Sequence, residues 1–191
     1  MSDRSNDMIP RTPLGGTEPR VDTHGPVTLT EVTNTAIASF ASRLGQESTA
    51  QDVLAKFLGT PVPEAGRAVF GDALGAFWTG PDQWMVTAPH TSHEDLAAQL
   101  VPLANGSASI TEQNDAWCRF DLLGDGLADV FERLCPFNIR ACSGGEATRT
   151  SIDHLGCFVV VADPTHIMVM GPRSSAGSLH HALMTAIRSA H

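Results

Sequence analysis

The sequence predicts an α+β fold of two similar halves, in which helices pack on antiparallel or mixed sheets. The first observation is a repeated hairpin: TGPDQWMVTAP at 79–89 and ADPTHIMVMGP at 162–172 share a turn proline, a Met-Val pair and a closing proline. These prolines are equally spaced, since 164 − 81 and 172 − 89 both equal 83. The second observation is that both halves follow the order strand, helix, strands, helix, without the repeated crossovers of a parallel sheet.

Matched residues outside the hairpin indicate that one unit occurs twice. Gly45 corresponds to Gly124 at an offset of 79 (124 − 45), and Leu74 corresponds to Leu155 at an offset of 81 (155 − 74). A slow drift of this kind is expected when only loops gain or lose residues. We therefore expect a single domain at 27–191 with two pseudo-repeats, ferredoxin-like halves at about 36–104 and 105–190.

The first half begins with a strand and a helix. Alternating apolar residues predict a strand at 35–45, and one apolar face predicts a helix at 47–59. Ser48 and Gln51 have capping-box spacing, and Gly59 suits a left-handed cap at the end of the helix.

A hairpin and a second helix complete the first half. Two apolar runs come first, AVFG at 68–71 and GAFWTGPDQWMVTAP at 75–89, and the hairpin turns at Gly80-Pro81-Asp82. The helix is expected at 92–104, capped by Ser92 and ending near Pro102.

The second half repeats this order. A strand is expected at 115–124 with Cys118, Phe120 and Leu122 on one face, and a helix at 125–136 has a stripe that includes Leu127 and Val130. Three strand-like runs and a C-terminal helix follow, at 147–156, 157–163, 166–172 and 174–190. Of the last helix, Leu179, Leu183 and Ile187 are expected to point inward.

Residues 1–26 form the expected extended N-terminal arm. They are rich in Pro, Gly, Asp, Thr and Arg and show no periodicity. Such a segment cannot fold on its own contacts, so we expect it to be ordered only where another surface holds it.

Composition limits the partners. The chain has 12 Lys and Arg against 21 Asp and Glu, a net charge of −9, which repels phosphate backbones and anionic lipid. We therefore expect no nucleic-acid and no membrane partner. The N-terminus lacks the apolar core of a signal peptide, and with four cysteines this favours a reducing, cytoplasmic location.

Four residues have zinc-ligand chemistry and form H-x-x-H and H-x-x-C pairs: His90, His93, His154 and Cys157. Solvated histidines and a buried cysteine explain them more simply. His180 and His181 are adjacent, which places them on different faces of a helix.

Motifs for nucleophilic catalysis and phosphate binding are absent from the sequence. Cys118 is expected to be a core residue, and Cys135 lies at a helix end just before Pro136. Three carboxylates flank one strand and would bind an amine or act as a base if they lined a cleft, although surface solubility is the simpler explanation: Glu112, Asp115 and Asp121. We assign no residue a catalytic, cofactor-binding or metal-binding role.

The three tryptophans, Trp78, Trp84 and Trp117, belong to strands, and core packing is expected for at least two of them. Trp117 shares one strand face with Arg119 and Asp121. Two interpretations of this face remain open: a protein–protein interface, or packing against a second layer of helices.

Four ordered motifs carry a resemblance to a known family: GPDQWMV, DAWCRFDLLGDGLADVFERLCPFNI, TRTSIDHLGCF and PRSSAGSLHHAL. Over about residues 28–189 the sequence resembles the gamma, or small, subunits of heterotetrameric sarcosine oxidases. The resemblance implies the folate-binding-type fold of the glycine-cleavage T-protein, a duplicated α+β arrangement.

The resemblance also implies a function in an assembly. Such a complex oxidatively demethylates sarcosine to glycine, with hydrogen peroxide and formaldehyde or 5,10-methylenetetrahydrofolate as further products. Its FAD, FMN, NAD, tetrahydrofolate and zinc are expected on the alpha, beta and delta subunits, with none on the gamma chain. A structural role without catalytic groups is then expected for this chain.

Two other functions stay open. One is a stand-alone, folate-binding one-carbon protein of the T-protein type, with a pocket between the pseudo-repeats and Asp115 as the nearest candidate carboxylate. The weaker one is a metal-dependent hydrolase that uses the four histidine and cysteine residues named above.

Overall fold

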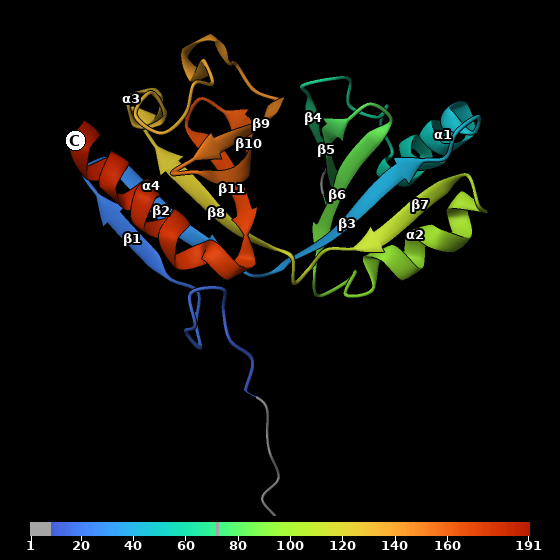
Figure 1. Cartoon of the computed structure of the whole chain (residues 1–191), viewed down its shortest axis with the longest axis horizontal. Coiled ribbons are helices and arrows are strands. Elements are labelled where there is room, and N and C mark those ends of the chain that lie inside the picture. Colours follow the sequence, from blue (N-terminus) through green and yellow to red (C-terminus); the bar gives the residue numbers. More distant parts are fainter. Residues whose placement is uncertain (1–8, 72) are drawn as a thin grey trace, which may run out of the picture.

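The computed structural model describes residues 9–71 and 73–191, which form two β-sheets flanked by helices (Figure 1). Sheet A has the strand order β1-β2-β8-β11-β10-β9 and sheet B the order β4-β5-β6-β3-β7. The strands of sheet A are β1 (Val21–His24), β2 (Val27–Val32), β8 (Trp117–Gly124), β9 (Glu146–Ile152), β10 (Leu155–Asp163) and β11 (His166–Pro172). Those of sheet B are β3 (Thr35–Ser42), β4 (Ala68–Phe70), β5 (Gly75–Gly80), β6 (Gln83–Pro89) and β7 (Ala108–Glu112). The helices are α1 (Glu47–Leu58), α2 (Leu96–Ala104), α3 (Leu127–Phe131) and α4 (Ala176–Ala190), with short 3₁₀ turns at Ile139–Ala141 and Arg173–Ser175.

The predicted α+β class and the duplication are confirmed by the topology. Read in spatial order, β4-β5-β6-β3-β7 corresponds to β9-β10-β11-β8-β2, and every strand pairing recorded in the described chain is antiparallel. The halves differ in the source of the fifth strand. In sheet B it is β7, which follows α2, whereas in sheet A it is β2, which precedes β3 in the chain.

Three apolar layers hold the elements together. Helices α3 and α4 cover the outer face of sheet A, and α1 and α2 cover the outer face of sheet B. The inner faces of the two sheets share a third cluster, in which the rings of Phe77 and Phe158 lie 5.2 Å apart. This cluster contains Ile37, Ala68, Phe77, Met85, Ala147, Phe158, Val160, Met168 and Met170.

The repeated Met-Val pair follows from this layering. Met85 and Met168 point into the cluster between the sheets, and Val86 and Val169 point toward the helices. Successive residues of a strand face opposite sides. Because both sides are buried here, both residues are apolar, and the same requirement in both halves produces the same pair.

The sheets are also joined along one edge, where β4 and β9 meet. Ala68 donates a backbone hydrogen bond to Gly145 (2.8 Å), and Ala147 donates one to Gly66 (2.8 Å). Beside them the Arg67 guanidinium pairs with Glu146 at 2.9 Å. One end of the space between the sheets is therefore closed by backbone contacts.

Helix α1 starts at Glu47, as the predicted range 47–59 has it, but the predicted capping box is wrong. Gln46 occupies the N-cap position without a side-chain cap, and Gln51 donates to Asp82 of the hairpin turn (3.1 Å) instead of closing a capping box with Ser48. Gly59 does form the predicted left-handed cap, at φ 72°.

The predicted start of α2 at residue 92 is wrong, whereas the predicted end at residue 104 agrees with the structure. The helix begins after Asp95, because residues around Ser92 form a turn in which His93 donates to the Pro89 carbonyl. Pro102 lies inside the last turn and does not end the helix. A proline there costs one backbone hydrogen bond, and the freed carbonyl can be solvated because this side of the helix is exposed.

Helix α3 is shorter than the expected 125–136. Gly126 has the positive φ of 78°, which starts the helix at Leu127, and the residue before Pro136 is disfavoured in a helix. The predicted stripe is nevertheless correct, since Leu127 and Val130 are buried. The inward residues predicted for the C-terminal helix, Leu179, Leu183 and Ile187, are buried as well.

Three strands were not predicted: β1, β2 and β7. Residues 21–24 of the expected arm form β1, which pairs with β2, and residues 1–8 of that arm lie outside the described residues. The segments of β2 and β7 are short, but β2 does alternate, with Val27 and Leu29 buried.

Glycines at corresponding positions provide a test of this fold. Gly124 has φ +133°, and a Cβ added there would lie 1.9 Å from the Pro26 carbonyl oxygen, whereas one added at Gly45 (φ +77°) would meet nothing within 4 Å. We expect Gly124→Ala to lower the free energy of unfolding by about 3 kcal/mol or more, and Gly45→Ala by about 1 kcal/mol. Urea unfolding of both variants measures this, and equal losses would contradict the backbone path described for β2 and β8.

Candidate functional site

A cavity of about 400 Å³ lies at the other end of the space between the sheets, under the N-terminal arm. Its walls come from the arm, from the start of β3 and from the start of β8, and include Thr12, Pro19, Ile37, Trp117, Arg119 and Arg173. A second hollow of about 410 Å³ lies on the other side of Arg119, next to His166 and Met168. This region brings together more of the polar residues singled out in the sequence than any other part of the described chain.

Trp117 forms an apolar wall of the cavity. Its ring packs on Phe158 with centroids 5.2 Å apart, and its indole nitrogen donates to the Gln113 side chain (3.2 Å). The expectation that at least two tryptophans pack in the core is confirmed, because Trp84 is buried and Trp78 packs partly buried against the same cluster.

The face that carries Trp117, Arg119 and Asp121 was interpreted as an interface or as a helix-packing face, and both interpretations are wrong. It faces sheet B across the cluster between the sheets. The sequence pattern shows that β8 has two different faces, but it does not show that the second face meets another sheet of the same chain.

Arg119 and Asp121 form the centre of a buried ion network. The Arg119 guanidinium donates to both Asp121 carboxylate oxygens at 2.7 Å and to the Thr35 hydroxyl at 3.2 Å. His166 Nε2 lies 2.9 Å from Asp121 Oδ2. Each guanidinium nitrogen of Arg119 therefore already has a protein acceptor, and the group fixes β8 to β3 and β11.

The environment of Asp121 shifts its titration. Burial disfavours the charged carboxylate, but hydrogen bonds from His166 and Arg119 outweigh this cost and leave the pKa of Asp121 below its ordinary value. The carboxylate is therefore ionised at neutral pH and paired on both sides. Its function in this arrangement is to neutralise buried charge.

Of the other two carboxylates, Asp115 lies at the cavity rim, and Glu112 contacts the rim residue Asn114. The Asp115 side chain is 95% exposed, and its carboxylate is 3.9 Å from Arg173 Nε. Glu112 accepts the Asn114 backbone N–H (2.7 Å), and the Asn114 side chain in turn accepts the Ile37 N–H (2.6 Å). These groups order the connection between the halves.

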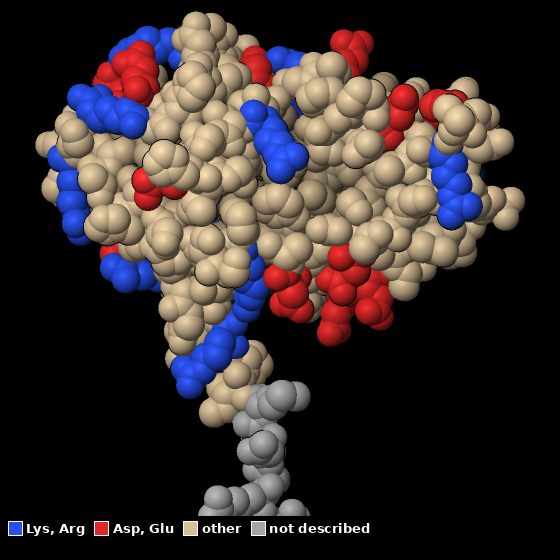
Figure 2. All heavy atoms as spheres, viewed as in Figure 1, with Lys and Arg blue, Asp and Glu red and all other residues tan. Residues whose placement is uncertain are grey.

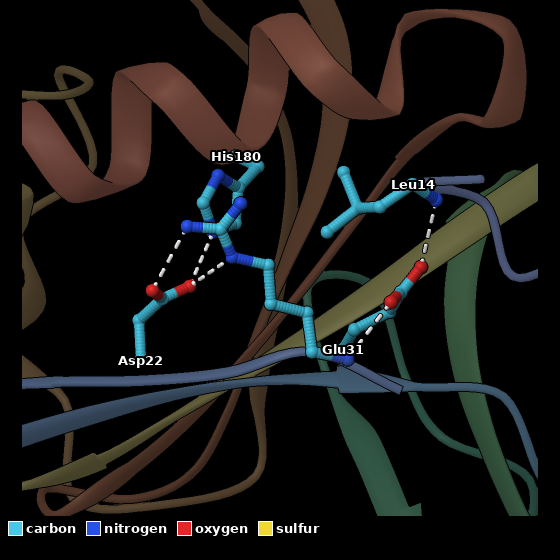
Figure 3. A network of polar contacts seen from close by, with 5 residues as sticks. Leu14, Asp22, Glu31 and His180 are labelled. Carbon is cyan, nitrogen blue, oxygen red and sulfur yellow. Dashed lines mark hydrogen bonds and ion pairs between the residues drawn. The ribbon is translucent and has the colours of Figure 1, made fainter. Parts of the chain in front are cut away.

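Sequence reasoning missed the buried carboxylate of Glu31 in β2, which holds the arm. Glu31 is 2% exposed and accepts the backbone N–H groups of Leu14 (2.8 Å) and Arg20 (3.0 Å) (Figure 3). The alternation of VTLTEV, in which Val27 and Leu29 also face inward, was the available signal.

A second contact fixes the arm to α4. Asp22 accepts hydrogen bonds from the Arg20 guanidinium (2.7 and 3.0 Å), and His180 Nε2 lies 2.8 Å from the same carboxylate (Figure 3). The Arg20 hydrogen bond is the main reason why the pKa of Asp22 lies below its ordinary value. The described arm is thus held by the chain's own surface, whereas the sequence suggested that another surface would hold it.

The four residues proposed as zinc ligands are not brought together. His90 lies at the cavity and His93 bonds Ser92 in the next turn, while His154 is in the β9–β10 turn and Cys157 is buried in the core under α4. Across residues 9–71 and 73–191, no cluster of three or more His, Cys, Asp or Glu side chains is placed to hold a metal ion.

The cysteines are buried or half-buried thiols without disulfide partners. Burial raises the pKa of Cys118 and of Cys157 to about 11, so the thiolate is scarce at neutral pH. The expected core role of Cys118 is confirmed.

No helix in the described part of the chain is long and apolar enough to cross a membrane.

The chain matches no protein-family model, and it has no sequence match among curated proteins. Its structure is similar to glycine cleavage system aminomethyltransferase T from Bartonella henselae, with a TM-score of 0.64 and 13% identity over 85% of this chain and 46% of that chain. The chain thus spans about half the length of that protein. The class of fold is that of the T-protein, as expected.

A second solved structure is more similar. It is a chain of heterotetrameric sarcosine oxidase from Corynebacterium sp. U-96 in complex with pyrrole 2-carboxylate, with a TM-score of 0.75 and 23% identity over 85% of this chain and 84% of that chain. Because the match covers nearly the same share of both chains, the two are similar in length. The fold implied by the sequence resemblance is therefore confirmed.

Removal of the arm anchor gives a first prediction for this region. We expect Glu31→Ala to lower the free energy of unfolding by about 2 kcal/mol, because two backbone donors lose a charged acceptor. Amide hydrogen exchange at Leu14 and Arg20 should become faster, while Glu18→Ala, a change at an exposed cavity residue, should leave it unchanged. Unchanged exchange in Glu31→Ala would contradict the anchoring role.

The ion network gives a pH-dependent prediction. Asp121→Asn should lower the free energy of unfolding by about 3 kcal/mol at neutral pH, because Arg119 is left buried without its counter-ion. The folded pKa of Asp121 is depressed, so its stabilisation is present above the ordinary value of 3.8 and is lost as the pH falls through the folded value. The difference in free energy of unfolding between wild type and Asp121→Asn should therefore become smaller below about pH 4. Exposed Asp115→Asn is the control, and a pH-independent difference would contradict the pairing.

Proposed function

We propose that this chain is a non-catalytic, structural subunit of a flavin-dependent amine-oxidising complex of the sarcosine oxidase type, in the position of the gamma subunit. The observation that carries the proposal is the shared fold and similar length with a chain of heterotetrameric sarcosine oxidase. The motifs described in the sequence support the same assignment independently of the fold.

The chemistry of the interior supports a structural role. The guanidinium of Arg119 and the carboxylates of Asp121 and Glu31 are used to bind strands and the arm, and the most deeply buried thiols are held protonated. Groups that already satisfy one another position the chain and are not available to a substrate without breaking those bonds.

In this proposal the alpha, beta and delta subunits are the partners, and they carry the FAD, FMN, NAD, tetrahydrofolate and zinc. The complex converts sarcosine to glycine with hydrogen peroxide and formaldehyde or 5,10-methylenetetrahydrofolate, in the cytoplasm. The contribution of this chain is to complete the assembly.

Affinity purification of the tagged full-length chain from its source cells tests the proposal. We expect chains with the visible absorption of bound flavin to co-purify, and the eluate to form hydrogen peroxide from sarcosine. A colourless, inactive eluate that contains only this chain as a stable monomer would overturn the assignment.

The second candidate is a stand-alone folate-binding protein, which the T-protein fold and the cavity of about 400 Å³ favour. Titration calorimetry of tetrahydrofolate into the isolated chain separates the two functions. Micromolar binding that is lost in Asp115→Asn would support the second candidate, and the absence of heat would remove it.

A further inference from the structure

Helix α2 has apolar residues on every side, unlike the longer helices of the fold. Its nine residues, LAAQLVPLA, include no charged side chain. By contrast, α1 exposes Asp52 and Lys56, and α4 exposes polar residues such as His181 and Arg188. The one polar residue of α2, Gln99, is exposed. A helix with so little polar surface is typical of a buried position.

Only one side of α2 is buried by this chain. Leu96, Leu100 and Ala104 point into the core of sheet B. The other side presents Ala98, Pro102 and two larger residues, Val101 and Leu103, which are each 52% exposed.

Leu44, in the turn between β3 and α1, is a further exposed apolar residue. It is 98% exposed, and its neighbour Arg43 donates a backbone hydrogen bond to Ser107, three residues after the helix ends. We call the exposed residues Leu44, Ala98, Val101, Pro102 and Leu103 the α2 face. Exposed apolar residues gathered on one element mark sites of protein association.

Carboxylates border the other end of the α2 face. Glu94 and Asp95 directly precede the helix, and Asn114 connects them to β7, since its side chain contacts the Glu94 carbonyl (3.4 Å) and its N–H binds Glu112. Figure 2 shows red Asp and Glu atoms gathered at the lower edge of the molecule, with uncharged surface beside them on the side where α2 lies in Figure 1.

We propose that the α2 face is the docking surface for the partner subunit of the complex, and that the partner presents an apolar patch bordered by Lys or Arg residues. This inference rests on the proposed function. The apolar centre supplies the burial, and the acidic border of Glu94, Asp95 and Glu112 selects a basic rim.

A second copy of this chain fits the α2 face less well. It would bring the same acidic border, with Arg43 as the basic side chain that a backbone contact places next to the helix end. In a chain of net charge −9, pairing of two copies brings like charges together. A basic partner removes that repulsion.

The test compares co-purification of flavin by tagged full-length variants. Val101→Glu combined with Leu103→Glu should reduce flavin recovered per chain at least about tenfold, about 1.4 kcal/mol of binding energy. Val21→Glu is the matched control, because Val21 is 59% exposed on β1, away from α2, and it should behave as wild type. Both positions are exposed, so the folded state tolerates the change, and circular dichroism checks this.

The charge border is tested separately with Glu94→Lys, which should weaken recovery and reduce its dependence on salt. If wild type recovers flavin and the α2 double variant recovers as much, the docking surface is wrong and the proposed function stands. If wild type recovers none, the proposed function fails and the docking inference falls with it. A wild-type homodimer that the double variant converts to monomer would also overturn the inference.

Discussion

The face-to-face packing of the two sheets is the contact on which the rest of the structure depends. Phe77 meets Phe158 across it, and Met85 and Met168 come from equivalent strands. Because each sheet buries its inner face on the other sheet, the helices can lie only on the two outer faces, and the central strands must be apolar on both sides. The symmetry of the fold thus follows from one interface that both halves help to form.

Polar residues in such an interface must be paired, since water cannot solvate them fully. Arg119 and Asp121 meet this requirement at the open end, where Thr35 and His166 complete their hydrogen bonds. Glu31 meets it at the arm by accepting two backbone donors. These carboxylates are structural in the same sense as the apolar residues around them: each fixes one segment against another.

The sequence predicted what periodicity and repetition determine locally. Local sequence predicted three features: the hairpin prolines, the two faces of β8 and the inward residues of α4. Each of these depends on neighbours close in the chain. Helix caps were less accurate, since Gln51 of α1 has a tertiary partner, Asp82, that competes with the capping box. A pocket between the halves near Asp115 was one of the open expectations, but its walls and the ion network were not predictable. Residues far apart in the chain, such as Thr35 and Arg119, meet only once the sheets pack.

The origin of β2 has a consequence for biosynthesis. Sheet B is encoded in one continuous stretch, from β3 to β7, so it can form as soon as that stretch has left the ribosome. Sheet A needs β2, which is made first, and β8, which is made some 85 residues later (117 − 32 = 85). Until then β2 can pair within its sheet only with the four-residue strand β1, and the edge that later binds β8 stays open. Long-range closure of this kind is slow and leaves an unprotected edge. Nascent chains should thus complete sheet B before sheet A, although the first strands of sheet A are made earlier.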